Sequence, residues 1–238
     1  MMLKIMCCPV NSCCGVTQKI LLSFLSMKHI YCISGFAADE RVFAHLNFGE
    51  NVFHFIPWKI PQSHESIGSY AHRMRQEILD PNPVLVGLSF GGMMSIEIAK
   101  EMPVEKIILI SSISTHHEMP LYMKVAGKLR LNHLFPLRPY SFLEPLENYN
   151  LGAQTPEDKQ LLREYRKNLN FQYSDWAIAR VLNWKNDWYP QNLIHIHGSK
   201  DHIFPVKNVK ADYIIKDGGH LMLMNKSGEV NEILKKVL

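Results

Sequence analysis

Short apolar runs alternate along the chain with longer segments in which apolar residues recur at helical spacing. The apolar runs predict β-strands at residues 29–33, 51–56, 83–86, 106–111, 193–198 and 211–215. The intervening segments predict helices at residues 39–46, 66–79, 92–100 and 230–238. Because strands and helices alternate, the pattern predicts an α/β fold in which helices flank a mostly parallel sheet.

This alternation stops between residues 115 and 190, where the pattern indicates helices and no clear strand. The helices of this insertion are predicted at 120–132, 156–168 and 174–184. The insertion is rich in large side chains, namely Tyr122, Met123, Phe135, Phe142, Trp176, Trp184, Trp188 and Tyr189. Most of them are expected to pack the insertion onto the sheet domain. As a group they favour a substrate with an apolar or aromatic moiety.

Residues 87–91, Gly-Leu-Ser-Phe-Gly, are the most informative motif of the chain because of where they lie. They match G-x-S-x-G, and they stand between the apolar run 83–86 and the helical segment 92–100. At such a sharp strand-to-helix turn, small residues let the backbone close, and the Ser89 hydroxyl stands clear of the sheet. We therefore interpret the motif as a nucleophile elbow rather than as an ordinary turn that contains a serine.

A serine nucleophile needs a histidine as general base and a carboxylate that orients the histidine. Asp201 follows the predicted strand 193–198, and His220 follows the last predicted strand behind two glycines. Loops at the carboxyl ends of strands are where open α/β sheets carry their functional groups. His202 and Asp217 are rival candidates, but His202 precedes the last strand, and Asp217 lies only three residues before His220.

Three motifs in this order resemble the α/β-hydrolase superfamily, and the resemblance covers residues 27–238. The matching segments are the elbow at 87–91, the H-G-x-x-D-x-x-x-P loop at 197–205 and the G-x-H loop at 218–220. The resemblance implies a catalytic triad of Ser89, Asp201 and His220. It also implies that residues 115–190 are a helical cap, which covers the nucleophile, excludes water and shapes the substrate pocket.

The resemblance further implies an oxyanion hole made of two backbone N–H groups. One belongs to Phe90, the residue after the nucleophile, and the other to the loop after the strand 29–33. In the superfamily that loop usually begins with His-Gly, whereas here Ser34 stands in place of the histidine and Gly35 is kept. By this alignment the second donor is the N–H of Phe36, a backbone group that the change at Ser34 does not remove.

Length and charge narrow the classes of function. With 238 residues, the chain is long enough for one domain with an insertion and for a sizeable core. The net charge is +4 with both signs interspersed, and the short basic clusters lack interleaved aromatic residues, so we expect no nucleic-acid partner. No apolar run approaches the roughly 20 residues that span a bilayer, so we expect no membrane span.

Four of the five cysteines fall within the first fourteen residues, at Cys7, Cys8, Cys13 and Cys14. Their spacing is not C-x-x-C, so we expect neither a zinc site nor a redox site there. Residues 27–30 open directly into the first strand, and we therefore predict that residues 1–26 are a poorly ordered extension from an upstream start codon. The lack of a convincing export signal and of a disulfide framework indicates a cytoplasmic location.

Most of the twelve histidines need no special role. His195 and His197 alternate on one predicted strand and therefore share a face, as a metal-binding pair would. No third ligand is evident from the spacing, so a structural role is favoured. His116 and His117 begin the insertion and are expected to be exposed. We expect neither a metal nor a cofactor.

The sequence thus predicts a serine hydrolase that works through a covalent acyl-enzyme on a small carboxylic ester with an apolar moiety. A thioesterase is an alternative, and so is a lyase or C–C bond hydrolase that uses the same triad. A non-catalytic binding protein on this scaffold is a further alternative, which a complete triad disfavours. The physiological substrate and the oligomeric state stay open.

Overall fold

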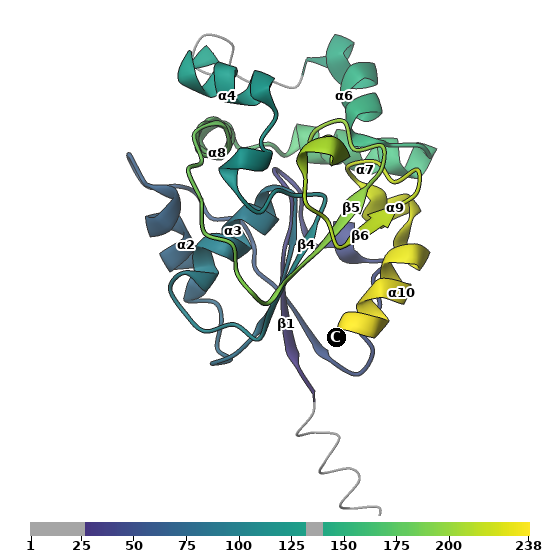
Figure 1. Ribbon diagram of the computed structural model, residues 1–238. Helices are drawn as coiled ribbons and strands as arrows, with labels where there is room; N and C mark the ends of the chain where they lie inside the picture. Colours follow the sequence, from purple (N-terminus) through teal and green to yellow (C-terminus); the bar gives the residue numbers. More distant parts are fainter. Residues whose placement is uncertain (1–26, 132–139) are drawn as a thin grey trace, which may run out of the picture.

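A six-stranded parallel β-sheet forms the centre of the computed structural model, which describes residues 27–131 and 140–238 (Figure 1). The strands are β1 (His29–Ile33), β2 (Val52–Phe55), β3 (Val84–Leu88), β4 (Lys106–Ile110), β5 (Leu193–Gly198) and β6 (Tyr213–Ile215). They lie in the order β2-β1-β3-β4-β5-β6, and every neighbouring pair is parallel. The predicted α/β fold with a mostly parallel sheet is confirmed.

The strand order creates a topological switch point between β1 and β3. The chain first steps from β1 to β2 on one side and then crosses to β3 on the other side of β1. In open α/β sheets, ligands bind outside the carboxyl ends of the strands at such a point. Ile33 pairs with Gly87 there, so the loop after β1 lies beside the turn after β3.

The side chains of each strand alternate between two hydrophobic clusters, one on each face of the sheet. In β1, Ile30 and Cys32 pack on the face that α10 (Ser227–Val237) covers. Tyr31 and Ile33 pack on the opposite face, which α2 (Ile67–Arg75) and α3 (Phe90–Ala99) cover. Both faces of the sheet are therefore buried, which explains why the strands appear in the sequence as continuous apolar runs.

Capping side chains mark two of the predicted helix starts. Ser66 accepts a hydrogen bond from the N–H of Ser69 at the start of α2, and Asp39 accepts one from the N–H of Arg41 at the start of η1 (Glu40–Phe43). The closing helix begins earlier than predicted, at Ser227. The short helices α9 (Met222–Asn225) and η4 (Val206–Asn208) were not predicted, because three or four residues are too few to show a helical period.

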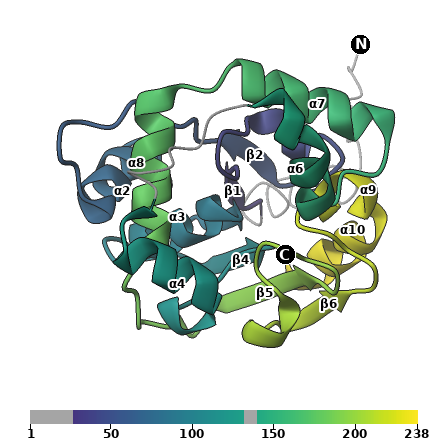
Figure 2. The same cartoon turned by 90° about the horizontal axis from the view of Figure 1, so that it is seen from above.

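Between β4 and β5, the described residues form four α-helices and no strand. They are α4 (Leu121–Lys128), α6 (Glu144–Leu151), α7 (Pro156–Lys167) and α8 (Phe171–Leu182), with the short helices η2 (His116–Glu118) and η3 (Ser141–Leu143). Figures 1 and 2 show these helices gathered over the end of the sheet where the strands finish. The sequence did not predict α6, because its large residues Leu146 and Tyr149 face solvent and leave no buried apolar stripe.

Two tryptophans of the insertion pack on the sheet domain, as most of its large side chains were expected to do. The indole N–H of Trp184 donates to the Glu97 carboxylate over 2.7 Å, and that of Trp176 donates to the Glu65 carbonyl over 2.8 Å. Trp176 also stacks on Tyr70, with 4.2 Å between the ring centroids. These contacts anchor α8 and the residues just after it to α2, α3 and the residue Glu65 before α2.

Some of the sequence predictions concern residues outside 27–131 and 140–238. These are the extension 1–26 with its four cysteines, and Phe135 of the insertion. Among the described residues, Cys32 is a free cysteine buried in β1. No helix in this described part of the chain combines the length and the hydropathy that crossing a bilayer requires.

The close approach of α4 to α8 generates a prediction about Gly127. A Cβ atom at Gly127 would lie 2.3 Å from the Leu182 carbonyl oxygen, whereas a Cβ at Gly228 of α10 would meet nothing within 4 Å. We expect Gly127→Ala to lower the free energy of unfolding by about 1–3 kcal/mol because α4 must move away from α8. The matched variant Gly228→Ala should instead raise it by up to about 1 kcal/mol.

Urea denaturation of the two variants tests this packing. Equal stability of Gly127→Ala and Gly228→Ala would show that α4 does not rest on α8 as closely as described.

Candidate active site

Ser89 lies at the turn between β3 and α3 in a backbone conformation that side-chain-bearing residues avoid. Its φ is 53° and its ψ is −118°, a combination that glycine reaches easily and other residues only with strain. Neighbouring backbone holds the turn in place. The Ser89 N–H donates to the Ile110 carbonyl over 2.9 Å, and the Ser112 hydroxyl donates to the Ser89 carbonyl over 2.7 Å. Both partners belong to β4 or the loop after it, so the sheet itself maintains the strained turn.

The two glycines of the motif stand where other backbone comes too close for a side chain. A Cβ at Gly87 would lie 2.4 Å from the Cα of Gly92, and a Cβ at Gly91 would lie 2.1 Å from the Ile33 carbonyl oxygen. Both distances are shorter than any real contact of a Cβ with backbone. Helix α3 can therefore start directly over the ends of β1 and β3 only because these two positions lack side chains.

The structure brings Ser89, His220 and Asp201 into one chain of hydrogen bonds. The Ser89 Oγ and the His220 Nε2 are 2.8 Å apart, and the His220 Nδ1 and the Asp201 Oδ2 are also 2.8 Å apart. Because an ionised carboxylate only accepts hydrogen bonds, Nδ1 carries the hydrogen and Nε2 faces the serine hydroxyl as an acceptor. His220 and Asp201 are both buried, so water does not compete for these contacts.

The loop after β5 holds the Asp201 carboxylate in this orientation. Its Oδ1 accepts hydrogen bonds from the backbone N–H groups of Ile203 at 2.8 Å and Phe204 at 2.9 Å. Burial alone would raise the pKa of this carboxyl, but its interactions with His220, His197 and the Phe204 N–H outweigh burial and keep the pKa of Asp201 below its ordinary value. Asp201 is therefore ionised at neutral pH, as an orienting carboxylate must be.

Two buried histidines of β5 stand behind Asp201. His197 donates from Nε2 to the Phe204 carbonyl over 2.7 Å, and this nitrogen lies 3.5 Å from the Asp201 Oδ2. The His195 Nε2 lies 3.3 Å from the His197 Nδ1. Burial lowers the pKa of both histidines, that of His195 to about 3, so both are neutral at pH 7. Their contacts brace the Asp201 loop, which agrees with the structural role expected of them.

The rival candidates lie away from the serine. Asp217 is exposed and forms an ion pair with Lys200 at 2.8 Å. His202 is exposed and its ring packs at a tilt against Tyr149 of α6, with 4.7 Å between the ring centroids. Neither residue contacts Ser89, so the hydrogen-bonding geometry favours Asp201 and His220 over both.

The loop expected to supply an oxyanion donor passes directly beside Ser89. A Cβ at Gly35 would lie 3.4 Å from the Ser89 Cβ. Ser34, which stands where the superfamily usually has histidine, donates to the Ala38 carbonyl over 2.6 Å and accepts from the Trp58 indole over 3.0 Å. These two bonds shape the loop without a histidine.

The N–H groups of Phe36 and Phe90 remain the expected oxyanion donors. Phe90 is the first residue of α3, so its N–H has no acceptor within the helix. Phe36 follows Gly35 in the loop that touches Ser89.

An apolar cavity of about 400 Å³ opens at Ser89 and His220. The insertion supplies much of its wall, through Met123 and Ala126 of α4, Leu151 of α6, Leu162 of α7, and Ile178 and Leu182 of α8. Two tyrosines line the cavity, and both of their hydroxyl groups already have partners within the protein. Tyr122 donates to the Ile203 carbonyl over 3.1 Å, and Tyr165 donates to the Asp39 carboxylate over 3.0 Å. Apart from Ser89 and His220, the described residues of the wall therefore offer a ligand mainly apolar surface.

The sequence missed most of this wall. Of the large side chains singled out in the insertion, Tyr122 and Met123 line the cavity, whereas Trp176 and Trp184 pack against the sheet domain. Helical periodicity shows which residues share a face of a helix. It does not show which face turns toward a cavity, and for this reason the sequence did not indicate that Ala126 lines one.

Comparisons with solved structures show which fold this is. The chain matches a lipase-esterase related protein from Clostridium acetobutylicum ATCC 824 with a TM-score of 0.61 and 17% identity, over 89% of this chain and 94% of that chain. It matches a meta-cleavage product hydrolase from Pseudomonas fluorescens IP01 with a TM-score of 0.63 and 15% identity, over 88% and 90%. It matches a hydrolase from Pseudomonas aeruginosa PA01 with a TM-score of 0.68 and 11% identity, over 89% of each chain. No family model and no curated protein matches the sequence.

The chain therefore has the α/β-hydrolase fold, as the three motifs of the sequence implied. At such low identity, a shared fold does not transfer an activity from one protein to another. The arrangement of the side chains around Ser89 is what bears on the activity of this chain.

The strained turn generates a prediction about stability. Strain at such a backbone position is of order 1–3 kcal/mol, and glycine would remove it at an entropic cost of about 0.4–1 kcal/mol. We therefore expect Ser89→Gly to be more stable than Ser89→Ala by about 1 kcal/mol, because both variants lose the hydroxyl and only glycine relaxes the turn. Urea denaturation measures the difference, and a Ser89→Ala protein at least as stable as Ser89→Gly would contradict the strain.

Proposed function

We propose that this protein is a serine hydrolase that cleaves carboxylic esters through a covalent acyl-enzyme. The observation that carries the proposal is the hydrogen-bond chain from Ser89 through His220 to Asp201, built at a strained turn beside an apolar cavity. A strained backbone persists at a cost to stability, and it is concentrated at functional sites. A turn that served the fold alone would not need a serine at this position.

In the proposed reaction, the Ser89 Oγ attacks the ester carbonyl carbon while the His220 Nε2 takes the hydroxyl proton. The tetrahedral intermediate collapses when the carbon–oxygen bond to the alcohol breaks, and His220 gives its proton to the leaving oxygen. Water then attacks the acyl-enzyme with His220 again as general base, and the acid leaves. Asp201 stays ionised throughout and stabilises the imidazolium that forms at each step.

Negative charge on the carbonyl oxygen needs donors that are in place before the reaction. We assign this role to the backbone N–H groups of Phe36, in the loop beside Ser89, and of Phe90, the residue after Ser89. The N-terminus of α3 adds the positive end of a helix dipole at the same point. Donors fixed in the backbone do not have to reorganise as the charge develops.

The cavity supports an apolar acyl or alcohol group as the substrate moiety. Its phenols are paired within the protein, and the rest of the wall that the insertion contributes is aliphatic. A charged or strongly polar group would therefore lose its hydration there without gaining partners. Thioesters with an apolar acyl group fit the same site and mechanism and form the second candidate substrate class.

Cleavage of a C–C bond by the same triad is a weaker candidate. The departing carbon would carry negative charge, which requires polar groups that hold an electron-withdrawing neighbour in place. The paired phenols and aliphatic side chains of the cavity do not offer such groups. A purely non-catalytic role does not account for the strained serine or for the complete hydrogen-bond chain.

The role of Ser89 is tested by removing its hydroxyl. We expect Ser89→Ala to abolish covalent labelling by a fluorophosphonate probe and to lower kcat for p-nitrophenyl esters by at least about 10³-fold. The control is Ser69→Ala, which changes an exposed serine of α2 and should keep both properties. Undiminished labelling of Ser89→Ala would exclude Ser89 as the nucleophile.

The role of the cavity is tested by filling it from α4. Ala126 lines the cavity, whereas the adjacent Val125 is exposed on the outside of the same helix. We expect Ala126→Leu to lower kcat/KM about 10-fold or more for p-nitrophenyl esters with long acyl chains, while leaving the acetate ester nearly unchanged. The matched Val125→Leu should leave the chain-length profile as it is. A profile that does not change in Ala126→Leu would mean that the substrate does not use this cavity.

A further inference from the structure

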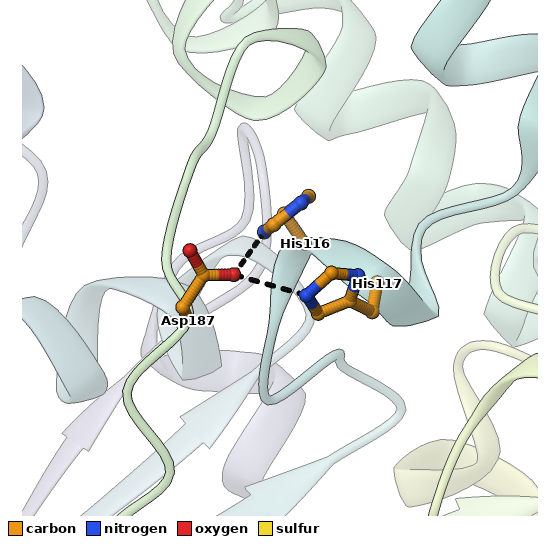
Figure 3. A group of neighbouring side chains, drawn as sticks. All are labelled: His116, His117 and Asp187. Atoms are coloured by element: carbon orange, nitrogen blue, oxygen red, sulfur yellow. Dashed lines mark ion pairs between the residues drawn. The ribbon is translucent and has the colours of Figure 1, made fainter.

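Three potential metal ligands meet on the surface, outside the site around Ser89. His116 and His117 belong to η2, and Asp187 lies between α8 and β5 (Figure 3). The Asp187 Oδ1 is 2.7 Å from the His116 Nδ1 and 3.1 Å from the His117 Nε2. His116 is half-buried, and the other two side chains are exposed. This is the group of three among the described residues whose ligand atoms lie close enough to share one ion.

The two segments that carry these residues are the two ends of the insertion, and the backbone ties them together. The His116 N–H donates to the Asn186 carbonyl over 2.8 Å. The Asn186 side chain is buried and donates from Nδ2 to the Ser114 carbonyl over 2.8 Å. These two hydrogen bonds hold the backbone of His116 beside Asn186, the residue that precedes Asp187.

The donor set defines the chemical class of the ion. Two imidazole nitrogens and one carboxylate oxygen suit zinc and its neighbours among the late first-row divalent ions better than Mg²⁺ or Ca²⁺, which prefer oxygen ligands throughout. Zinc bonds of about 2.0–2.1 Å in a tetrahedron place ligand atoms about 3.3 Å apart. The observed separations of 2.7 and 3.1 Å need to open by about 0.6 and 0.2 Å to reach this value.

We propose that His116, His117 and Asp187 bind one zinc-class divalent cation, with water in the fourth position. The bound ion would link η2 to the segment before β5 and so clip the two ends of the insertion to each other. Lys124 contacts the cluster only through the backbone, where it donates to the His117 carbonyl over 3.0 Å. The His116 Nδ1 also lies 3.2 Å from the Asn186 carbonyl oxygen, and an ion bound at this nitrogen would replace that contact. This site is independent of the proposed hydrolase activity.

An exposed histidine–carboxylate pair elsewhere supplies a matched comparison. The His72 Nδ1 lies 2.8 Å from the Glu101 Oε2, much as in the cluster, but this pair belongs to no group of three candidate ligands in the described residues. It should therefore bind zinc far more weakly than the cluster does. Its removal controls for the loss of any surface histidine.

Isothermal titration with ZnCl₂ tests the site on the full chain without a histidine tag. Because thiolates also bind zinc, every protein carries Cys7→Ser, Cys8→Ser, Cys13→Ser and Cys14→Ser. We expect one zinc ion per chain, with affinity at least about 10-fold weaker in His117→Ala and in Asp187→Asn. Affinity should be unchanged in His72→Ala. Unfolding midpoints in EDTA should agree among all the variants, which shows that each one folds.

Hydrogen exchange supplies a second measurement that does not depend on activity. Zinc should slow exchange of the peptide that contains the His116 N–H, EDTA should reverse the effect, and Asp187→Asn should lose it. Zinc binding that is absent, or that is equally strong in His117→Ala, Asp187→Asn and His72→Ala, would overturn the proposal and leave His116, His117 and Asp187 as a metal-free ion-pair cluster.

Discussion

The positive-φ backbone at Ser89 is the constraint on which the rest of the site depends. This conformation depends on the pairing of β3 with a strand on each side. On the β4 side, Ile110 and Ser112 form hydrogen bonds with the backbone of Ser89. On the other side, β1 brings the Ile33 carbonyl close to Gly91. A sheet with a different strand order would not bring these groups together. The switch point between β1 and β3 thus brings Ser89 and the loop of Gly35 to one place, because the pairing register sets Ile33 beside Gly87.

The other two members of the hydrogen-bond chain arrive from the far half of the sequence. Ser89 and His220 are separated by 131 positions, yet their side chains meet because β3, β5 and β6 end at the same edge of a parallel sheet. Burial of an ionised Asp201 there would be unfavourable in isolation. Two backbone N–H groups and His220 compensate for it, and the neutral histidines of β5 stand behind it. The insertion covers this edge with mainly aliphatic side chains, so the polar side chains of Ser89 and His220 face an apolar cavity.

Specific contacts attach the insertion to the sheet domain and hold its parts together. Trp184 and Trp176 join α8 to the sheet domain, Gly127 lets α4 rest on α8, and Asn186 ties the two ends of the insertion together. The hydrogen-bond chain of Ser89, His220 and Asp201 does not include any residue of the insertion. In the proposed function, different parts of the chain therefore carry the chemistry and the selection of substrate, and the proposed cation at His116, His117 and Asp187 would act on the insertion alone.

The sequence by itself determined the α/β fold, the position of the strained turn, and the order of Ser89, Asp201 and His220, because these depend on local patterns and on motifs of fixed spacing. Tertiary structure alone decided that His220 reaches Ser89, that α6 forms with Leu146 and Tyr149 outward, and that Ala126 lines a cavity. It also decided that Asp187 lies against His116 and His117. Each of these facts rests on contacts between segments far apart in the chain, or on which face of a helix turns inward, and no periodicity within one segment encodes either.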